Sequence, residues 1–221
     1  MELLTRHIPR CWTAIVLGTA LSSGCHPQPA DAEPQEAELE AEADTTADRL
    51  ATAFADWLTV STRASGEPVY APHCRYFRPG CEERIRALAD LITEEAYAYD
   101  LDPFLIGAVA VKESGLDPTA VGPRGSIGIL QLNPRGVGAG LRFTRQPDYR
   151  RQCARLRVTA CQEPIIERGT EHLAGWLEQC DDLVPALAGY NSGECRQPSG
   201  YARRVLRIRD DLIARADVSS E

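Results

Sequence analysis

The fold is decided by residues 102–134, which read DPFLIGAVAVKESGLDPTAVGPRGSIGILQLNP. Asp102 is a favoured N-cap residue, and Pro103 then occupies the first helical position, where proline is tolerated. Gly115 is typical of a helix C-terminus. The residues that follow contain glycine and proline repeatedly, which is the composition of a loop. The stretch therefore predicts a short helix followed by a glycine-rich loop.

An acidic side chain is expected on the apolar side of this helix. Ile106, Val109 and Ala110 recur at the spacing of one helical face, and the next residue on that face is Glu113. Burial disfavours the charged form of a carboxylate, so an unpaired glutamate in this position is costly. Proteins keep such an arrangement mostly where a proton must be handled near neutral pH. The alternative is a surface glutamate paired with Lys112 or with a nearby arginine. The first interpretation makes Glu113 a candidate general acid.

Three short motifs follow one another along the chain: Glu113-Ser114, GSIGILQLNP at 125–134 and AGYNSG at 188–193. Together, and in this order, they resemble the signature motifs of lytic transglycosylases. The resemblance is to the catalytic domain of the soluble lytic transglycosylase type, which has a lysozyme-like fold and is related to goose-type lysozyme. It covers about residues 88–212. It departs at Leu130, where the family usually has methionine, and at Gly189, where a second alanine is usual.

The resemblance implies a peptidoglycan lytic transglycosylase that cleaves the β-1,4 bond between N-acetylmuramic acid and N-acetylglucosamine. Most glycosidases use two carboxylates, but one suffices when the substrate supplies the nucleophile. This chain offers one well-placed carboxylate, because Asp117 lies beyond the helix break. In the implied route Glu113 protonates the leaving oxygen while the acetamide of muramic acid attacks the anomeric carbon. The same residue then deprotonates the 6-hydroxyl, which closes a 1,6-anhydro ring. No cofactor and no metal is expected.

The same resemblance implies substrate-binding roles for Ser114, Gln131, Tyr190, Asn191 and Tyr201, each with an alternative. Ser114 orients the sugar or its peptide, or else only caps the helix. Gln131 binds the acetamide or the glycan, or else braces its own loop. Tyr190 donates its hydroxyl toward the catalytic acid or the acetamide, or else packs in the core. Asn191 binds sugar or fixes the turn, and Tyr201 lines the groove or packs in the core.

Three other functions fit the same residues. A muramidase like the goose-type lysozymes would add water, and it would need further acidic residues to position that water, which are not obvious in the sequence. A non-catalytic envelope lipoprotein that binds peptidoglycan would not need an acid on an apolar helix face. An accessory enzyme of a secretion or conjugation apparatus would share the chemistry and also bind an envelope protein partner.

The charge of the chain is concentrated near its N-terminus. The net charge is −8, and residues 1–70 hold eleven acidic and four basic side chains. Residues 71–221, with twenty-one acidic and twenty basic side chains, are nearly neutral. Because no basic stripe with interleaved aromatic residues is present, nucleic-acid binding is not expected.

Residues 1–24 resemble an export signal. Arg6 and Arg10 precede the apolar residues 11–21, a stretch too short to span a bilayer as a helix. The next residues, SSGC, resemble the end of a bacterial lipobox, which makes Cys25 the expected site of lipidation. The alternative is cleavage and secretion without a lipid. We expect an exported protein of the cell envelope that is held at a membrane by its lipid and faces the periplasm.

The rest of the chain divides into a linker and one domain. Residues 25–48 are rich in alanine, glutamate and proline and contain no aromatic residue, which predicts a disordered acidic linker. Residues 49–221 are expected to form the catalytic domain. Helical spacing recurs through this region and no convincing alternating strands occur, so the prediction is a mainly α, lysozyme-like domain with little or no sheet.

The predicted domain contains six cysteines: Cys74, Cys81, Cys153, Cys161, Cys180 and Cys195. An even number in an exported chain indicates disulfides, and six cysteines allow fifteen pairings. We expect sequence neighbours to pair, since each bond would then staple a loop beside a helix. Zinc binding is the alternative, and it is disfavoured because no close Cys-x-x-Cys pair occurs.

Overall fold

The computed structural model describes residues 34–75, 80–156, 158–196 and 200–218. The predicted signal segment and Cys25 lie outside the described residues. Within these ranges the chain forms nine α-helices and a single two-stranded sheet, which confirms the predicted mainly α fold with little sheet. No helix of the described ranges has the length and apolar character needed to cross a membrane.

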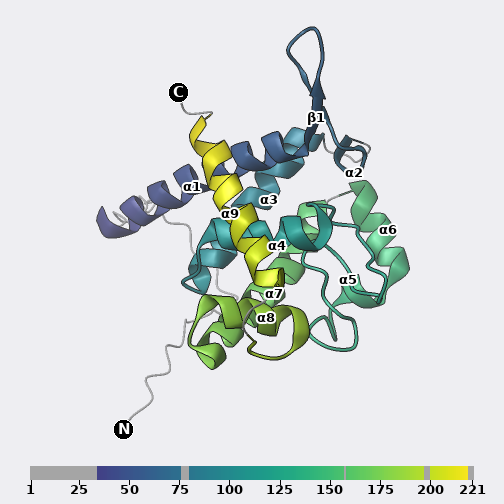
Figure 1. Ribbon diagram of the computed structural model, residues 1–221. Helices are drawn as coiled ribbons and strands as arrows, with labels where there is room; N and C mark the ends of the chain where they lie inside the picture. The colour runs from purple at the N-terminus through teal and green to yellow at the C-terminus, as the bar shows by residue number, and fades with distance from the viewer. Residues whose placement is uncertain (1–33, 76–79, 157, 197–199, 219–221) are drawn as a thin grey trace, which may run out of the picture.

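The helices are numbered in chain order, and the longest ones make up the body of the domain. Their bounds are α1 Pro34–Leu58, α2 Pro72–Arg75, α3 Cys81–Ala98, α4 Pro103–Ser114, α5 Arg142–Arg145, α6 Pro147–Leu156, α7 Val158–Cys180, α8 Leu183–Ser192 and α9 Gly200–Val218. Strands β1 (Thr59–Thr62) and β2 (Pro68–Tyr70) pair in antiparallel fashion. They form a hairpin that projects away from the helical body (Figure 1).

Helix α4 lies at the centre of the domain, and α9 crosses it (Figure 1). The Asp102 carboxylate accepts a hydrogen bond from the Phe104 backbone N–H at 2.9 Å, and Gly115 ends the helix in the left-handed conformation, as predicted. The helix is buried continuously from Pro103 to Val111, so it is apolar all round rather than on one face. Only its C-terminal turn therefore reaches the surface.

Helix α1 begins at Pro34, inside the segment that the sequence predicts to be a disordered linker. Its C-terminal part packs on α3 and α9 and supplies the fully buried Leu50 and Phe54 to the core. Ala47 is also buried, so packing begins before residue 49. Residues from Pro34 on are helical in the structure, where the sequence predicts a disordered linker, and their alanine and glutamate residues favour helix. A helix that is already ordered by packing can extend through such residues without a new nucleation cost.

Helix α7 also begins earlier than its sequence suggests. Pro164 is expected to open this helix, but α7 starts at Val158 and Pro164 lies inside it. The disulfide between Cys153 and Cys161 joins this first part of α7 to α6. The cross-link therefore orders a region whose composition alone did not indicate secondary structure.

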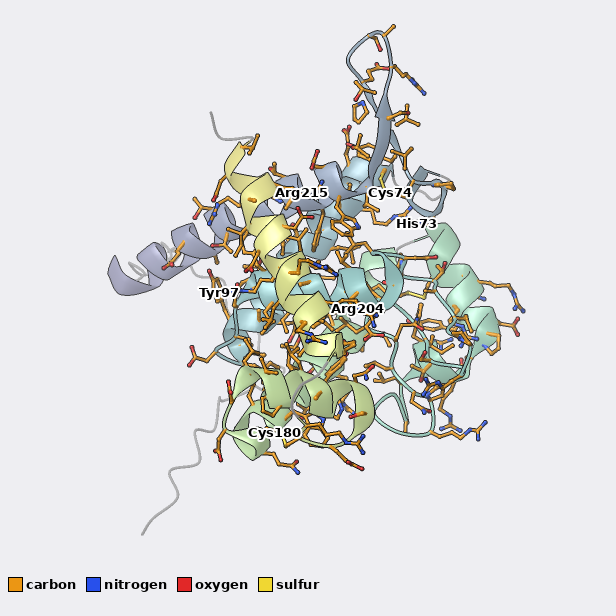
Figure 2. All side chains as sticks on the ribbon, in the orientation of Figure 1. His73, Cys74, Tyr97, Cys180, Arg204 and Arg215 are labelled. Carbon is orange, nitrogen blue, oxygen red and sulfur yellow. A yellow bond between two sulfur atoms is a disulfide. The ribbon has the colours of Figure 1, made fainter. Side chains whose placement is uncertain are left out.

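Three disulfides join sequence neighbours, as predicted: Cys74–Cys81, Cys153–Cys161 and Cys180–Cys195. The first joins α2 to α3, and the last brackets α8. Cys74 and Cys180 lie at opposite ends of the domain (Figure 2). The disulfides account for the six cysteines without zinc, and no cluster of metal-ligating side chains is found in the described part of the chain.

Candidate active site

A cleft of about 490 Å³ opens at the C-terminal end of α4. Four elements contribute to it, namely the last turn of α4, the loop that follows, helix α7 and the end of α8. The residues that line it are Lys112, Glu113, Pro123, Arg124, Ser126, Leu130, Gln131, Leu132, Asn133, Val137, His172, Tyr190 and Asn191. The cleft thus collects residues from all three sequence motifs.

Glu113 is half-buried in this cleft and is held by a tyrosine from the other end of the domain sequence. The hydroxyl of Tyr201, at the start of α9, donates to Oε1 of Glu113 at 2.6 Å. Burial raises the pKa of Glu113, while the Tyr201 hydrogen bond and the positive charge of Lys112 partly oppose the rise. The carboxyl therefore holds its proton at a higher pH than an ordinary glutamate does.

Tyr201 is buried and remains a hydrogen-bond donor. Burial raises its pKa, and the negative charge of Glu113 raises the pKa further, so its phenol keeps the proton. The ammonium of Lys112 lies 5.3 Å from the centre of the Tyr201 ring, within the range of a cation–π contact. Because Tyr201 occupies Oε1, the acidic proton of Glu113 is left to Oε2. The pair can present one proton to a ligand in the cleft.

The loop after α4 is braced by a glutamine. The side-chain amide of Gln131 donates to the carbonyls of Ala120 at 3.1 Å and Gly128 at 2.9 Å, and Ser126 donates to its Oε1 at 2.8 Å. A Cβ at Gly122 would overlap Oε1 of Gln131 and Oγ of Ser126, so a larger residue there would displace the hydrogen bond between these two side chains. The loop-bracing alternative for Gln131 is therefore what the structure has. A substrate contact through Gln131 stays a prediction, and it would have to use Oε1, since both N–H groups are engaged.

Tyr190 lies in the cleft, but its hydroxyl is not directed at the acid as the sequence-based prediction has it. The hydroxyl donates to the carbonyl of Leu130 at 3.1 Å. Burial raises its pKa, and the charge of Glu113 adds to the rise. The tyrosine that contacts Glu113 is Tyr201 instead. Tyr190 thus ties α8 to the glycine-rich loop and closes the cleft on that side.

The family to which these residues belong follows from a comparison with protein-family models. The model for the transglycosylase SLT domain matches residues 90–204. The chain belongs to this family. Membership supports a lytic transglycosylase type of activity on peptidoglycan. No curated protein and no solved structure matches the chain.

The two remaining predicted substrate-binding residues of the SLT domain, Ser114 and Asn191, differ in their relation to the cleft. Ser114 donates its hydroxyl to the Ala110 carbonyl at 3.0 Å, within its own helix, and it is not among the residues that line the cleft. Asn191 lines the cleft and is exposed. The structure therefore favours the helix-end alternative for Ser114 and leaves the Asn191 side chain facing the space a substrate would fill.

His172 is a cleft residue of the SLT domain that the sequence did not single out, because it lies outside the three motifs. Trp176 donates its indole N–H to Nε2 of His172 at 3.1 Å, which leaves the proton of a neutral imidazole on Nδ1. Burial lowers the pKa of His172 and favours this neutral form. The imidazole also lies against Tyr190, with ring centres 5.4 Å apart. His172 therefore supports Tyr190 from the α7 side.

Trp176 explains why this chain has glycine at position 189, where the family usually has alanine. A Cβ at Gly189 would overlap the indole ring of Trp176. The second alanine that is usual in the family would not fit beside this tryptophan. Trp176 and His172 also line a second hollow, of about 510 Å³, which shares His172 and Val137 with the cleft. The two hollows therefore adjoin along α7.

Proposed function

We propose that this protein is a peptidoglycan lytic transglycosylase that cleaves between N-acetylmuramic acid and N-acetylglucosamine and leaves a 1,6-anhydromuramic end. The observation that carries the proposal is the half-buried Glu113, which has a raised pKa and a bound Tyr201 hydroxyl. Glu113 is the sole carboxylate among the described residues that line the cleft. This composition favours a route that needs one carboxylate over a route that needs two.

In the first step Glu113 acts as a general acid. Its proton passes to the oxygen of the scissile bond, and the bond from that oxygen to the anomeric carbon of muramic acid breaks. The carbonyl oxygen of the muramic acid acetamide forms a bond to the same carbon, so the substrate supplies the nucleophile. The raised pKa of Glu113 suits this step, because the residue has to hold a proton until the substrate takes it.

In the second step the Glu113 carboxylate acts as a general base. It takes the proton of the muramic acid 6-hydroxyl, the 6-oxygen bonds to the anomeric carbon, and the bond to the acetamide oxygen breaks. Glu113 is then protonated again and no water is consumed. Between the steps the Tyr201 hydrogen bond stabilises the carboxylate, since a donor that binds a charged acceptor gains strength.

We further propose that the protein is exported and that Cys25 carries a lipid that holds it in the cell envelope. Two features support this proposal: the N-terminal sequence with its lipobox-like end, and the three disulfides, which are characteristic of oxidising compartments. The test is the intact mass of the protein from the membrane fraction. A mature chain that begins at Cys25 and carries acyl chains supports the proposal, and a chain without lipid contradicts it.

The enzymatic proposal is tested by digesting purified peptidoglycan sacculi and weighing the soluble products. Anhydro products are lighter than hydrolysis products by the mass of one water molecule, and we expect only these. Hydrated products with reducing ends would instead identify a muramidase. A folded protein that pellets with sacculi and releases no products would identify a peptidoglycan-binding protein without activity.

A further inference from the structure

The segment that forms one wall of the cleft and continues through α5 into α6 carries a positive charge that the proposed chemistry does not use. Residues 118–152 contain six arginines and one acidic residue, Asp148, although the whole chain has a net charge of −8. This segment runs from the loop after α4 through α5 and into α6, on one side of the domain (Figure 1). The arginines are Arg124, Arg135, Arg142, Arg145, Arg150 and Arg151.

Of these six arginines, only Arg151 forms an ion pair with a described carboxylate, that of Asp148. Arg124 and Arg135 are the two whose positions relate to the cleft. Arg124 and Arg135 are both exposed, and neither lies within ion-pair distance of a described carboxylate. Most arginines elsewhere in the domain are paired, as in Arg49–Asp217, Arg63–Glu67, Arg86–Asp90, Arg168–Glu171 and Arg215–Asp211. The charges of Arg124 and Arg135 are therefore available to a ligand.

Both arginines lie on the loop along which a glycan strand bound in the cleft would run. Arg124 lines the cleft itself. The backbone N–H of Arg135 donates to Oδ1 of Asn133 at 2.9 Å, and Asn133 lines the cleft. The residue after Arg135, Gly136, lines the second hollow. Arg135 thus lies on the loop between the cleft and the second hollow, and Arg124 lies in the cleft that contains Glu113.

We propose that Arg124 and Arg135 form a binding site for the carboxylates of the peptide stems of peptidoglycan. The inference rests on the proposed function, because it takes a glycan strand to be the ligand of the cleft. Each muramic acid carries its peptide on the lactyl group, and these peptides have free carboxylates. A guanidinium binds a carboxylate through two parallel hydrogen bonds, so an exposed and unpaired arginine suits this ligand. The enzyme then prefers glycan with peptides to glycan without them.

The test measures binding rather than cleavage, so that it does not depend on turnover. The Glu113→Gln variant is mixed with intact sacculi and with sacculi whose peptides have been removed by an amidase, and the bound fraction is measured across a range of salt concentrations. We expect about fivefold tighter binding to the intact sacculi at low salt, since exposed ion pairs are individually weak. We expect the preference to shrink at about 0.5 M salt, where exposed charges are screened.

Two variants are compared in the same background. Arg124→Gln with Arg135→Gln should remove the preference for intact sacculi. Arg63→Gln is the control, because Arg63 is an exposed arginine on the projecting hairpin and is not a residue of either hollow. This variant should keep the preference. Equal binding of the parent protein to both kinds of sacculi would overturn the inference, and so would a preference that survives in the double variant.

The failure of this inference can be told apart from failure of the proposed function. Anhydro products from peptide-free glycan, together with equal binding to both kinds of sacculi, would support the proposed enzymatic activity and rule out the arginine site. Binding that prefers intact sacculi, without any products from the unmodified protein, would support the arginine site and rule out the enzymatic activity. Binding to neither kind of sacculi would contradict both the arginine site and the proposed activity.

Discussion

Two glutamates in different regions of the domain have raised pKa values, and only one of them lies in a cleft. Burial raises the pKa of Glu113 at the end of α4 and of Glu95 on α3. The charges near Glu95 are those of Glu94, Glu163 and Glu167, which raise its pKa further. The charge and the hydroxyl near Glu113 act in the opposite direction.

The difference shows that a raised pKa alone does not identify a catalytic acid. Glu95 belongs to an acidic surface where α3 packs on α7, and it lines neither hollow described above. Glu113 lines a cleft, and a tyrosine holds one of its oxygens at 2.6 Å. The cleft and the fixed orientation distinguish Glu113, the proposed catalytic acid, from Glu95, and the following predictions test that distinction.

The largest effect is expected from Glu113→Gln. The amide fills the same space and can accept from Tyr201, but it cannot carry the acidic proton. We expect the release of soluble muropeptides from sacculi to fall by roughly 10² to 10⁴, the usual contribution of a general acid or base. Glu95→Gln is the matched control and should retain activity. Comparable losses in both variants would erase the contrast between the two glutamates.

Tyr201→Phe should come next, because it removes the donor that holds Glu113 while keeping the ring. A hydrogen bond to a charged group is worth about 1.5–3 kcal/mol, which corresponds to a roughly ten- to hundredfold loss of kcat. The lost donor also lets the pKa of Glu113 rise further. Since the first step needs protonated Glu113, activity falls as pH rises through that pKa. The alkaline limb of the pH–activity profile should therefore move to higher pH. A limb that stays in place would show that Tyr201 does not act on Glu113.

Tyr190→Phe should be milder. Its hydroxyl donates to the Leu130 carbonyl, so the bond lost is between neutral groups and is worth about 1 kcal/mol of unfolding free energy. We expect that loss in chemical denaturation, less than about a tenfold fall in kcat, and an unchanged alkaline limb. If Tyr190→Phe moved the limb as Tyr201→Phe does, the assignment of the two tyrosines would be reversed.

The smallest effect is expected from Glu95→Gln. Because the pKa of Glu95 is raised in the folded state, its ionisation costs stability once the pH rises above the ordinary glutamate value. The variant should be more stable than the parent at neutral pH, by less than about 0.5 kcal/mol, as is usual for like charges on a surface. The gain should vanish at acid pH and in high salt. Urea denaturation at two pH values measures it, and a variant less stable than the parent at neutral pH would contradict the repulsion.

Sequence alone predicted the parts of the site that depend on local signals. The cap at Asp102, the break at Gly115 and the apolar residues between them place Glu113 at the end of a buried helix. The disulfides join cysteines that are close in sequence, so neighbour pairing was within reach of the same reasoning. The motifs located the cleft, although they did not give the partners of each side chain.

The remaining features depend on packing between distant segments. Tyr201 contacts Glu113 across 88 residues because α9 crosses α4, and no local pattern encodes that crossing. The choice between the two alternatives for Gln131 depended on how the loop folds back on its own amide. The glycine at position 189 is explained only by Trp176, which comes from another helix.

The central claim is that Glu113 cleaves the glycan without adding water, and digestion of sacculi in water labelled with heavy oxygen tests it most directly. If the 6-hydroxyl of the sugar completes the reaction, the soluble products carry no heavy oxygen and have anhydromuramic ends. One heavy oxygen at each new muramic acid end would contradict the account, because water would then have attacked the anomeric carbon.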